Sequence, residues 1–250
     1  MGIAEQKVAL ITGAAGGLGQ ALAKILISEG YQLILTSRSA TRLSDVYGNN
    51  HLQITADCAT VAGAKHIFEV CNMQNLVPTV FAHCVGNIRL GALHRMPEED
   101  FTACLSANLL SAFHTLAAFV GHLKTTKLAG SAVFVSSAAA QIGTPNHEAI
   151  SVAKAGLEGL VRGAAATYAS SGIRVNAVAP GLIDTPAASG ILTSELSREM
   201  AARQYPIAGI GNAADVAHLM AWLLSEHAAR VTGQIWAIDG GFSAIRPIVK

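Results

Sequence analysis

The sequence predicts an α/β fold in which seven parallel strands form a doubly wound sheet with helices on both faces. Short apolar runs alternate along the chain with segments of helical periodicity, and strands buried on both faces are apolar almost throughout. A glycine-rich stretch joins the first apolar run to the first helical segment, which is typical of a turn that holds a phosphate. The length of 250 residues favours one domain over residues 1–250.

The predicted elements follow one another in a regular order. Strands are expected at seven apolar runs, namely Val8–Thr12, Gln32–Thr36, His51–Ala56, Thr79–Cys84, Ala132–Val135, Arg174–Val178 and Gln234–Ile238. Helices are expected over Leu18–Ser28, Ser39–Tyr47, Val61–Cys71 and Glu98–His122, around Lys154 and near Ala213. Because parallel strands need long crossover connections, the helices between them support a parallel sheet.

Composition limits the partners of the protein. Hydrophobic residues make up 51% and charged residues 13% of the chain, so part of the surface must be polar but uncharged or covered by another subunit. We expect a homodimer or homotetramer, with a deep core as the alternative explanation. The net charge of +1 gives no reason to expect nucleic acid or an anionic membrane as a partner.

The N-terminal segment, the apolar runs and the cysteine spacing indicate where the protein is located and whether it binds a metal. The charged segment Met1–Gln6 leads into a strand, so we expect no signal peptide, and no run of 18 apolar residues predicts a membrane span. The four cysteines, at positions 58, 71, 84 and 104, form no C-x-x-C pair. They are expected to be reduced, buried thiols rather than metal ligands, in a cytoplasmic protein.

The glycine-rich stretch has the pattern T-G-x-x-x-G-x-G, with Thr12, Gly13, Gly17, Leu18 and Gly19 in it. Glycines let the backbone turn sharply and approach a pyrophosphate at the N-terminus of the following helix. A structural turn would explain the glycines alone, but not their position within an alternating α/β chain.

Further motifs occur in the order known from one protein family. Their residues are Asp57 after the third strand, Gly86 after the fourth, Asn108 in Ala-Asn-Leu-Leu, Pro180, Gly181 and Thr185 in the segment 180–186, Val231 to Gln234, and Asp239 to Gly241. Over essentially its whole length the chain resembles the short-chain dehydrogenase/reductase family, in particular the 3-oxoacyl-carrier-protein reductase branch. The resemblance implies a Rossmann-like fold and an oxidoreductase of carbonyl compounds or secondary alcohols. It also implies cofactor contacts from Asp57 at the adenine, from Gly86, and from Pro180, Gly181 and Thr185 beside the nicotinamide, while the residues from Val231 to Gly241 match the usual C-terminal signature.

The end of the second strand favours NADP(H) over NAD(H). An acidic residue there would bind the ribose 2′-hydroxyl of NAD, but the sequence has Thr36-Ser37-Arg38. Arg38 suits a 2′-phosphate, because its planar guanidinium matches phosphate oxygens. A solvated arginine at a helix start is the alternative, and Gly16 stands where NADP-preferring relatives often carry a basic residue.

The catalytic residues implied by the resemblance are incomplete. In the family a tyrosine exchanges the proton, a serine holds the substrate oxygen, and a lysine lowers the tyrosine pKa and binds the ribose. A helix asparagine completes the set. Ser137, Lys154 and Asn108 match three of these positions, but the fourth, four residues before the lysine, is Ile150. The usual proton donor is therefore missing.

Other groups in the sequence are candidates for this role. His147, three residues before Ile150, is a candidate acid because imidazole titrates near neutrality. The alternative is a helix start in which Asn146 is the N-cap and Glu148 complements the helix dipole. Ser137, or a water between it and Lys154, could also pass on the proton.

His83, where the family usually has asparagine, is expected to be a hydrogen-bonded core histidine.

Two hypotheses remain open at this point. The first is an NADP(H)-dependent oxidoreductase with an unusual proton route, and the second is a catalytically silent dinucleotide-binding protein that serves as a sensor or structural partner. In the first hypothesis the substrate is a small-molecule or acyl-thioester carbonyl compound.

The resemblance also implies a substrate lid at residues 187–206. The apolar residues of this segment fit either an apolar substrate or the packing of an amphipathic lid against the protein.

Overall fold

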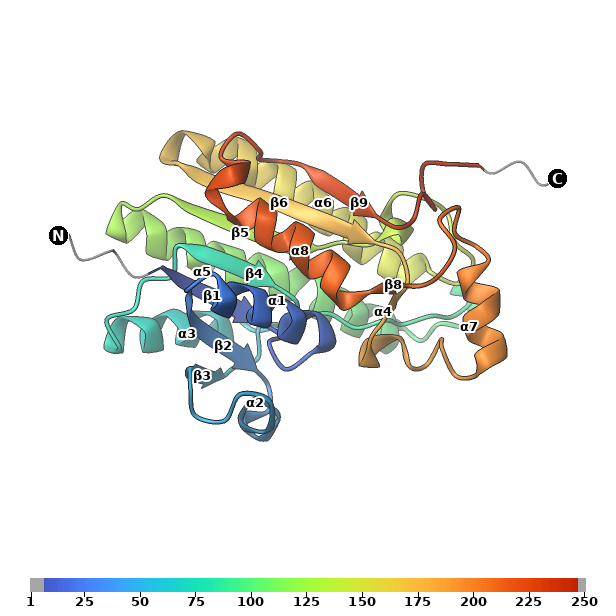
Figure 1. Ribbon diagram of the computed structural model, residues 1–250, viewed down its shortest axis with the longest axis horizontal. Helices are drawn as coiled ribbons and strands as arrows, with labels where there is room; N and C mark the ends of the chain where they lie inside the picture. Colours follow the sequence, from blue (N-terminus) through green and yellow to red (C-terminus); the bar gives the residue numbers. More distant parts are fainter. Residues whose placement is uncertain (1–6, 247–250) are drawn as a thin grey trace.

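The computed structural model describes residues 7–246, so the expectation about Met1–Gln6 lies outside the described residues. Figure 1 shows a central sheet between two layers of helices. Its strands are β1 (Val8–Thr12), β2 (Gln32–Ser37), β3 (Leu52–Thr55), β4 (Val80–His83), β5 (Gly130–Val135), β6 (Ile173–Pro180) and β9 (Ile235–Ile238). Their order in the sheet is β3-β2-β1-β4-β5-β6-β9, and every neighbouring pair is parallel. The predicted doubly wound sheet of seven strands is confirmed.

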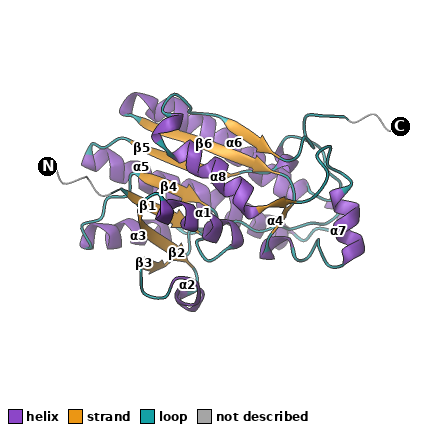
Figure 2. Cartoon of the chain, in the orientation of Figure 1, coloured by secondary structure: helices purple, strands orange, loops and turns teal. Residues whose placement is uncertain are grey.

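Helices cover both faces of the sheet (Figures 1 and 2). They are α1 (Gly17–Ser28), α2 (Ala40–Tyr47), α3 (Val61–Met73), α4 (Glu98–Leu105), α5 (Ser111–Thr126), α6 (Glu148–Tyr168), α7 (Glu195–Ala202) and α8 (Ala213–Leu224). One buried cluster joins the sheet to α3, α5 and α6, and a second joins the opposite face to α1 and α8. The apolar strand sequences are explained by these two cores, since each strand is covered on both sides.

The topology marks one edge of the sheet as the place for a ligand. The chain runs outward from β1 to β2 and β3, then returns to β4 beside β1 and continues in the other direction. Ligands of open α/β sheets bind at the carboxyl ends of the strands where the direction reverses. The glycine-rich stretch after β1 and the segment His83–Gly86 after β4 both lie at this point.

The predicted helix over Glu98–His122 is one long helix with an irregular middle. A π-helical segment, Ser106–Leu110, separates α4 from α5, and the helix continues to Thr126. By length and composition alone the helix 98–126 is apolar enough to cross a membrane. In the fold its buried residues, among them Phe119 and Leu123, pack in the core against α3 and the sheet. The apolar composition is therefore explained by core packing.

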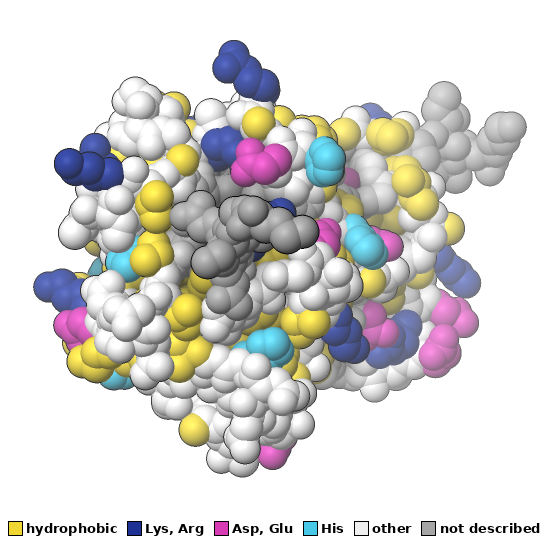
Figure 3. All heavy atoms as spheres, turned by 60° about the vertical axis from the view of Figure 1, so that its left-hand side comes forward, with side chains coloured by type: hydrophobic (Ala, Val, Ile, Leu, Met, Phe, Trp, Pro, Cys, Tyr) yellow, Lys and Arg dark blue, Asp and Glu magenta, His cyan; other side chains and the backbone are white. Residues whose placement is uncertain are grey.

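The surface carries few charges and some large apolar side chains. Figure 3 shows one face on which basic and acidic side chains are scattered among apolar and polar ones. Phe113 on α5 and Val152 on α6 are 50% and 51% exposed. A short parallel pair, β7 (Ile183–Asp184) with β8 (Gly211–Asn212), was not expected and flanks α7.

Candidate active site

A cavity of about 800 Å³ lies at the carboxyl ends of the strands. Of the site residues predicted from the sequence, its wall contains Gly13, Gly17, Leu18, Gly19, Arg38, Asp57, Gly86, Asn108, Ser137, Lys154, Pro180, Gly181 and Thr185. Thr12 and His147 are outside this wall. Segments from nearly the whole length of the chain thus meet in one place, as the motif order required.

The glycine-rich stretch forms a cradle that larger residues would fill. Gly13 has φ +69°, and a Cβ atom there would lie 2.7 Å from the carbonyl oxygen of Cys84. A Cβ atom at Gly19 would lie 2.5 Å from the carbonyl oxygen of Gly13. The N-cap of α1 is Gly16, which offers no side chain to the first N–H groups of the helix. These N–H groups and the helix dipole suit an anionic pyrophosphate, so the cradle fits a dinucleotide.

Two side chains of α2 hold the carbonyl groups of this cradle. The Tyr47 hydroxyl donates to the Ala14 oxygen at 2.7 Å, and Arg42 Nη2 donates to the Ala15 oxygen at 3.1 Å. Arg42 lines the cavity together with Arg38, four residues earlier in the sequence. Sequence reasoning missed Arg42, because Arg38 precedes the N-cap of α2 and helical spacing does not relate the two residues. Two guanidinium groups therefore lie at the end of the cavity beside β2.

His83 and Thr12 belong to a buried polar cluster rather than to the cavity wall. The His83 ring lies 2.9 Å from the Thr12 hydroxyl, 3.2 Å from that of Thr115 and 3.1 Å from that of Ser111. Burial lowers the pKa of His83 to about 3, and the charge of Lys154 acts in the same direction. The ring is neutral at physiological pH, and the prediction of a hydrogen-bonded core histidine is confirmed. Thr12 thus supports the end of β1 from inside.

Lys154 is a buried cation on the cavity wall. Its side chain is 6% exposed, and Nζ donates to the Val135 oxygen at 2.7 Å. Burial lowers the pKa of Lys154 to about 8, although the nearby thiols of Cys104 and Cys84 act in the opposite direction. Within residues 7–246 no carboxylate forms an ion pair with it. An amine with this pKa exchanges its proton in the neutral range.

Ile150 lies one helical turn before Lys154 and also lines the cavity. It is 4% exposed and packs with Cys104, Ala139 and Ala153 in a small apolar cluster between α4 and α6. The wall beside the lysine is therefore apolar at the position where the resemblance predicts a phenol.

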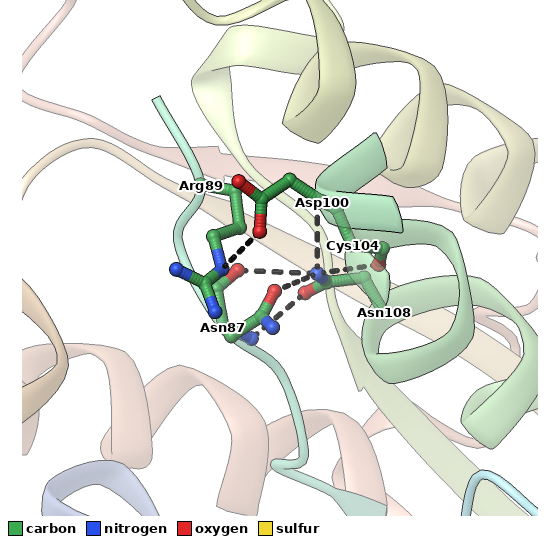
Figure 4. A network of polar contacts seen from close by, with 5 residues as sticks. All are labelled: Asn87, Arg89, Asp100, Cys104 and Asn108. Carbon is green, nitrogen blue, oxygen red and sulfur yellow. Dashed lines mark hydrogen bonds and ion pairs between the residues drawn. The ribbon is translucent and has the colours of Figure 1, made fainter. Parts of the chain in front are cut away.

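Asn108 is held by the loop that follows β4 (Figure 4). Its Nδ2 atom donates to the backbone oxygen of Asn87 at 3.1 Å, to Asn87 Oδ1 at 2.9 Å and to the Cys104 oxygen at 2.9 Å. In return its Oδ1 atom accepts from the Asn87 backbone N–H at 3.3 Å. The π-helical segment places the Asn108 side chain toward this loop. Asn87 was missed from the sequence, because nothing local indicates which loop residue meets the helix.

The loop that carries Ser137 is attached to α6 by Glu158. The carboxylate oxygen Oε1 of Glu158 accepts from Ser136 Oγ at 2.8 Å and from Gln141 Nε2 at 3.3 Å. Glu158 is 7% exposed and lies one turn after Lys154. One buried carboxylate thus fixes the backbone on both sides of Ser137, whose own Oγ accepts from the Ala139 N–H.

Glu158→Ala is expected to lower kcat for carbonyl reduction by about 10-fold to 100-fold, because small displacements of positioned groups are costly in catalysis. The free energy of unfolding should fall by about 1–3 kcal/mol, since Ser136 and Gln141 lose their buried acceptor. NADPH consumption and urea denaturation measure the two effects. The matched control is Arg162→Ala, which removes an ion-pair partner 3.7 Å from Glu158 that is 56% exposed. An equally large effect of Arg162→Ala would show that the ion pair, not the attachment of the loop, matters.

His147 is the N-cap of α6, and its Nδ1 atom lies 2.8 Å from the Pro145 oxygen. Its position outside the cavity wall gives no support to a role as the acid. The expectation that Asn146 caps the helix is wrong, because His147 is the N-cap. Asn146 has φ +63° and precedes the N-cap, a left-handed conformation that asparagine tolerates better than most residues. Glu148 does occupy the first turn, where its charge complements the dipole.

The segment after β6 closes the cavity on its other side. The Tyr205 hydroxyl accepts from the Leu182 N–H at 2.7 Å. The Asp239 carboxylate accepts from the N–H groups of Gly241 and Ser243 at 2.9 and 2.8 Å. These bonds explain the C-terminal motif structurally, because Asp239 holds the turn that packs beside Tyr205.

Known proteins resemble this chain over nearly its whole length. The family model described as enoyl-(acyl carrier protein) reductase matches residues 13–243. Carbonyl reductase family member 4 of Danio rerio is 32% identical over 243 residues, covering 96% of this chain and 99% of that protein. The 3-oxoacyl-[acyl-carrier-protein] reductase FabG of Escherichia coli K12 is 31% identical over 240 residues, covering 95% and 97%. The chain belongs to the short-chain dehydrogenase/reductase family.

Among solved structures of similar fold is ElxO with NADP bound. It is 26% identical to this chain, covers 95% of it and 99% of its own chain, and has a TM-score of 0.88. A tyrosine-to-phenylalanine variant of ElxO, with the same TM-score of 0.88, has NADPH bound. As a short-chain dehydrogenase/reductase, the protein has the fold and the cavity of an oxidoreductase that uses a nicotinamide dinucleotide. Among residues 7–246 no three His, Cys, Asp or Glu side chains gather in a group that could hold a metal ion.

Proposed function

We propose that the protein is an NADP(H)-dependent oxidoreductase that acts on a carbonyl group or a secondary alcohol. The observation that carries this proposal is the single cavity whose wall contains the glycine cradle at one end and Lys154, Ser137 and Asn108 at the other. The bound nicotinamide would supply or accept the hydride. Ser137 Oγ is available to donate to the substrate oxygen, and Lys154 is available to bind the nicotinamide ribose.

Two guanidinium groups support NADP(H) over NAD(H). Arg38 and Arg42 line the end of the cavity beside β2, and both are exposed. Each can donate two hydrogen bonds to a 2′-phosphate. Residues Thr36 and Ser37, which precede Arg38, are uncharged and give the 2′-hydroxyl of NAD no carboxylate at this position. The similar structure of ElxO has NADP bound, which also supports NADP(H) as the cofactor.

The lid and the assembly complete the proposal. Residues 187–206, which include α7, lie beside the cavity wall at Ala187 and Ala188 and are proposed to cover the substrate. A small-molecule or acyl-thioester carbonyl compound suits this apolar wall. The exposed Phe113 and Val152 on α5 and α6 support a homodimer or homotetramer, and a cytoplasmic location stays a prediction.

The decisive test measures consumption of NADPH and NADH by the purified protein with a panel of small ketones and 3-oxoacyl thioesters. We expect turnover with NADPH at least about 10-fold faster than with NADH at equal low concentrations. Arg38→Gln should weaken NADPH binding by about 10-fold to 100-fold through the lost contact to the phosphate and leave NADH binding unchanged. Arg42→Gln should weaken the binding of both cofactors, because Arg42 also holds the Ala15 oxygen of the cradle.

The control is Arg230→Gln, which changes an exposed arginine beside the separate small cavity that Thr79 and Arg174 line. It should affect neither cofactor. Equal use of NADPH and NADH would contradict the cofactor assignment. Tight NADPH binding without consumption of any carbonyl compound would establish the silent dinucleotide-binding protein instead.

A further inference from the structure

We propose that the ammonium group of Lys154 donates the proton to the substrate oxygen directly, in place of the phenol that the family uses. This inference rests on the proposed function and names the group that completes it. Three features of the site lead to it, namely the apolar neighbour of the lysine, the free hydrogens on Nζ, and the weakness of the competing acids.

The first feature is the position of the lysine relative to Ile150. Both residues line the cavity on the same face of α6, one turn apart. Ile150 has no polar atom in its side chain, so nothing from position 150 can hold a substrate oxygen or pass on a proton. The ammonium of Lys154 is the next group along this face.

The second feature is the hydrogen bonding of Nζ. An ammonium has three hydrogens, and one of them is donated to the Val135 oxygen at 2.7 Å. That bond anchors Nζ beside the backbone of Gly86, where a Cβ atom would lie 3.5 Å away from it. Two hydrogens remain for the cavity, one for a cofactor ribose and one for the substrate oxygen.

The third feature is the set of titratable groups around Nζ. Cys84 and His83 face it from the end of β4, and Cys104 faces it from α4. Burial raises the pKa of Cys84 to about 12 and also raises that of Cys104, while His83 is neutral with a pKa of about 3. None of these groups gives up a proton readily near neutrality. Burial lowers the pKa of Lys154 to about 8, which suits a general acid.

In the direction of reduction, the proposed step moves a hydride to carbon and a proton to oxygen. A bound reduced nicotinamide would supply a hydride, that is, a proton with two electrons, to the carbonyl carbon, and the π pair of the C=O bond would move to oxygen. The oxygen takes a proton from Nζ, and the electrons of the broken N–H bond stay on nitrogen. Lys154 becomes a neutral amine and is protonated again by solvent before the next turnover. Alcohol oxidation is the reverse and needs the neutral amine as base.

The experiment is the pH dependence of kcat/KM at saturating cofactor in both directions. Reduction needs the protonated amine, so its kcat/KM should be constant below pH 8 and fall tenfold per pH unit above it. Oxidation needs the neutral amine, so its kcat/KM should rise tenfold per pH unit up to about pH 8. Lys154→Arg keeps a cation for the cofactor but does not release its proton. It should lower kcat/KM for reduction by about 10²–10⁴-fold and remove the change of slope near pH 8, called the break below. The NADPH affinity measured by fluorescence should change only a few fold.

Two further measurements do not depend on the folding of the arginine variant. His147→Ala alters a partly exposed side chain outside the cavity wall and should leave the break in place. In wild-type protein with 13C-labelled lysine, one side-chain signal should titrate near pH 8, apart from the exposed lysines. Loss of the break in His147→Ala, a break that survives in Lys154→Arg, or no lysine titrating below pH 9 would each overturn the inference. Absence of any NADPH consumption would contradict the proposed function itself.

Discussion

Ile150→Tyr is expected to raise kcat/KM for carbonyl reduction by up to about 10²-fold, the lower end of a general acid's usual contribution, because the phenol takes over a role that Lys154 already fills. Position 150 lies on the cavity wall one turn before Lys154, so a phenol there would point into the space where the substrate oxygen is proposed to lie. The buried ammonium of Lys154 would lower the pKa of that phenol by favouring its charged form. The proton would then come from an oxygen acid, and the lysine would keep only its cation role.

The measurement is NADPH consumption with the best substrate of the wild-type protein. Ile150→Phe is the matched control, because it adds the same ring without the hydroxyl and should not raise the rate. Ile150 is 4% exposed and packs against Cys104 and Ala153, so either ring costs about 1–3 kcal/mol of stability if the cluster does not adjust. A tyrosine variant that folds, binds NADPH and is no faster than wild type would show that a phenol at position 150 does not donate the proton.

Gly19→Ala is expected to weaken NADPH binding by at least about 100-fold, or about 2.8 kcal/mol. The added methyl group would lie 2.5 Å from the Gly13 oxygen and 2.8 Å from Ala14 Cα. Both are backbone atoms of the cradle itself, so the loop must move before the methyl group fits. A displaced loop no longer aims the N–H groups of α1 at the pyrophosphate.

Fluorescence titration with NADPH measures this loss, and thermal unfolding shows how much of it reflects a general loss of stability. Gly121→Ala is the control, because a Cβ atom at this α5 position meets nothing within 4 Å. It should leave NADPH binding unchanged and stabilise the helix by about 1 kcal/mol. Equal NADPH affinity in Gly19→Ala and wild type would mean that the cradle does not bind the pyrophosphate.

Local patterns in the sequence were sufficient for the fold. Apolar runs such as Val8–Thr12 and Gln32–Thr36 became strands within about one residue of the expected ends. The reason is that a strand covered on both faces must be apolar throughout, a requirement that is visible without knowing its neighbours. Most of the site residues predicted from motif order line the cavity, because most of these motifs follow the carboxyl end of a strand and those ends meet at one edge of the sheet.

Residues whose role depends on a partner far along the chain could not be found in this way. Asn87 meets Asn108 across 21 residues, and Ser136 meets Glu158 across 22 residues. Which side chains meet is decided by the packing of α4 and α6 on the sheet, and no local period encodes it. His147 shows the converse, since its spacing from Ile150 made it a candidate and the start of the helix at Glu148 placed it outside the cavity wall.

The sequence by itself thus determined the sheet, the glycine cradle and the pairing of Lys154 with an apolar Ile150, because these follow from residue type and short-range spacing. Only the tertiary structure decided the environment of that lysine. Its burial, its bond to Val135 and the two thiols beside it come from α4, β4 and β5 together. The physical reason is that a pKa depends on solvent exposure and on charges brought close by folding, and neither is a property of the residue or its sequence neighbours.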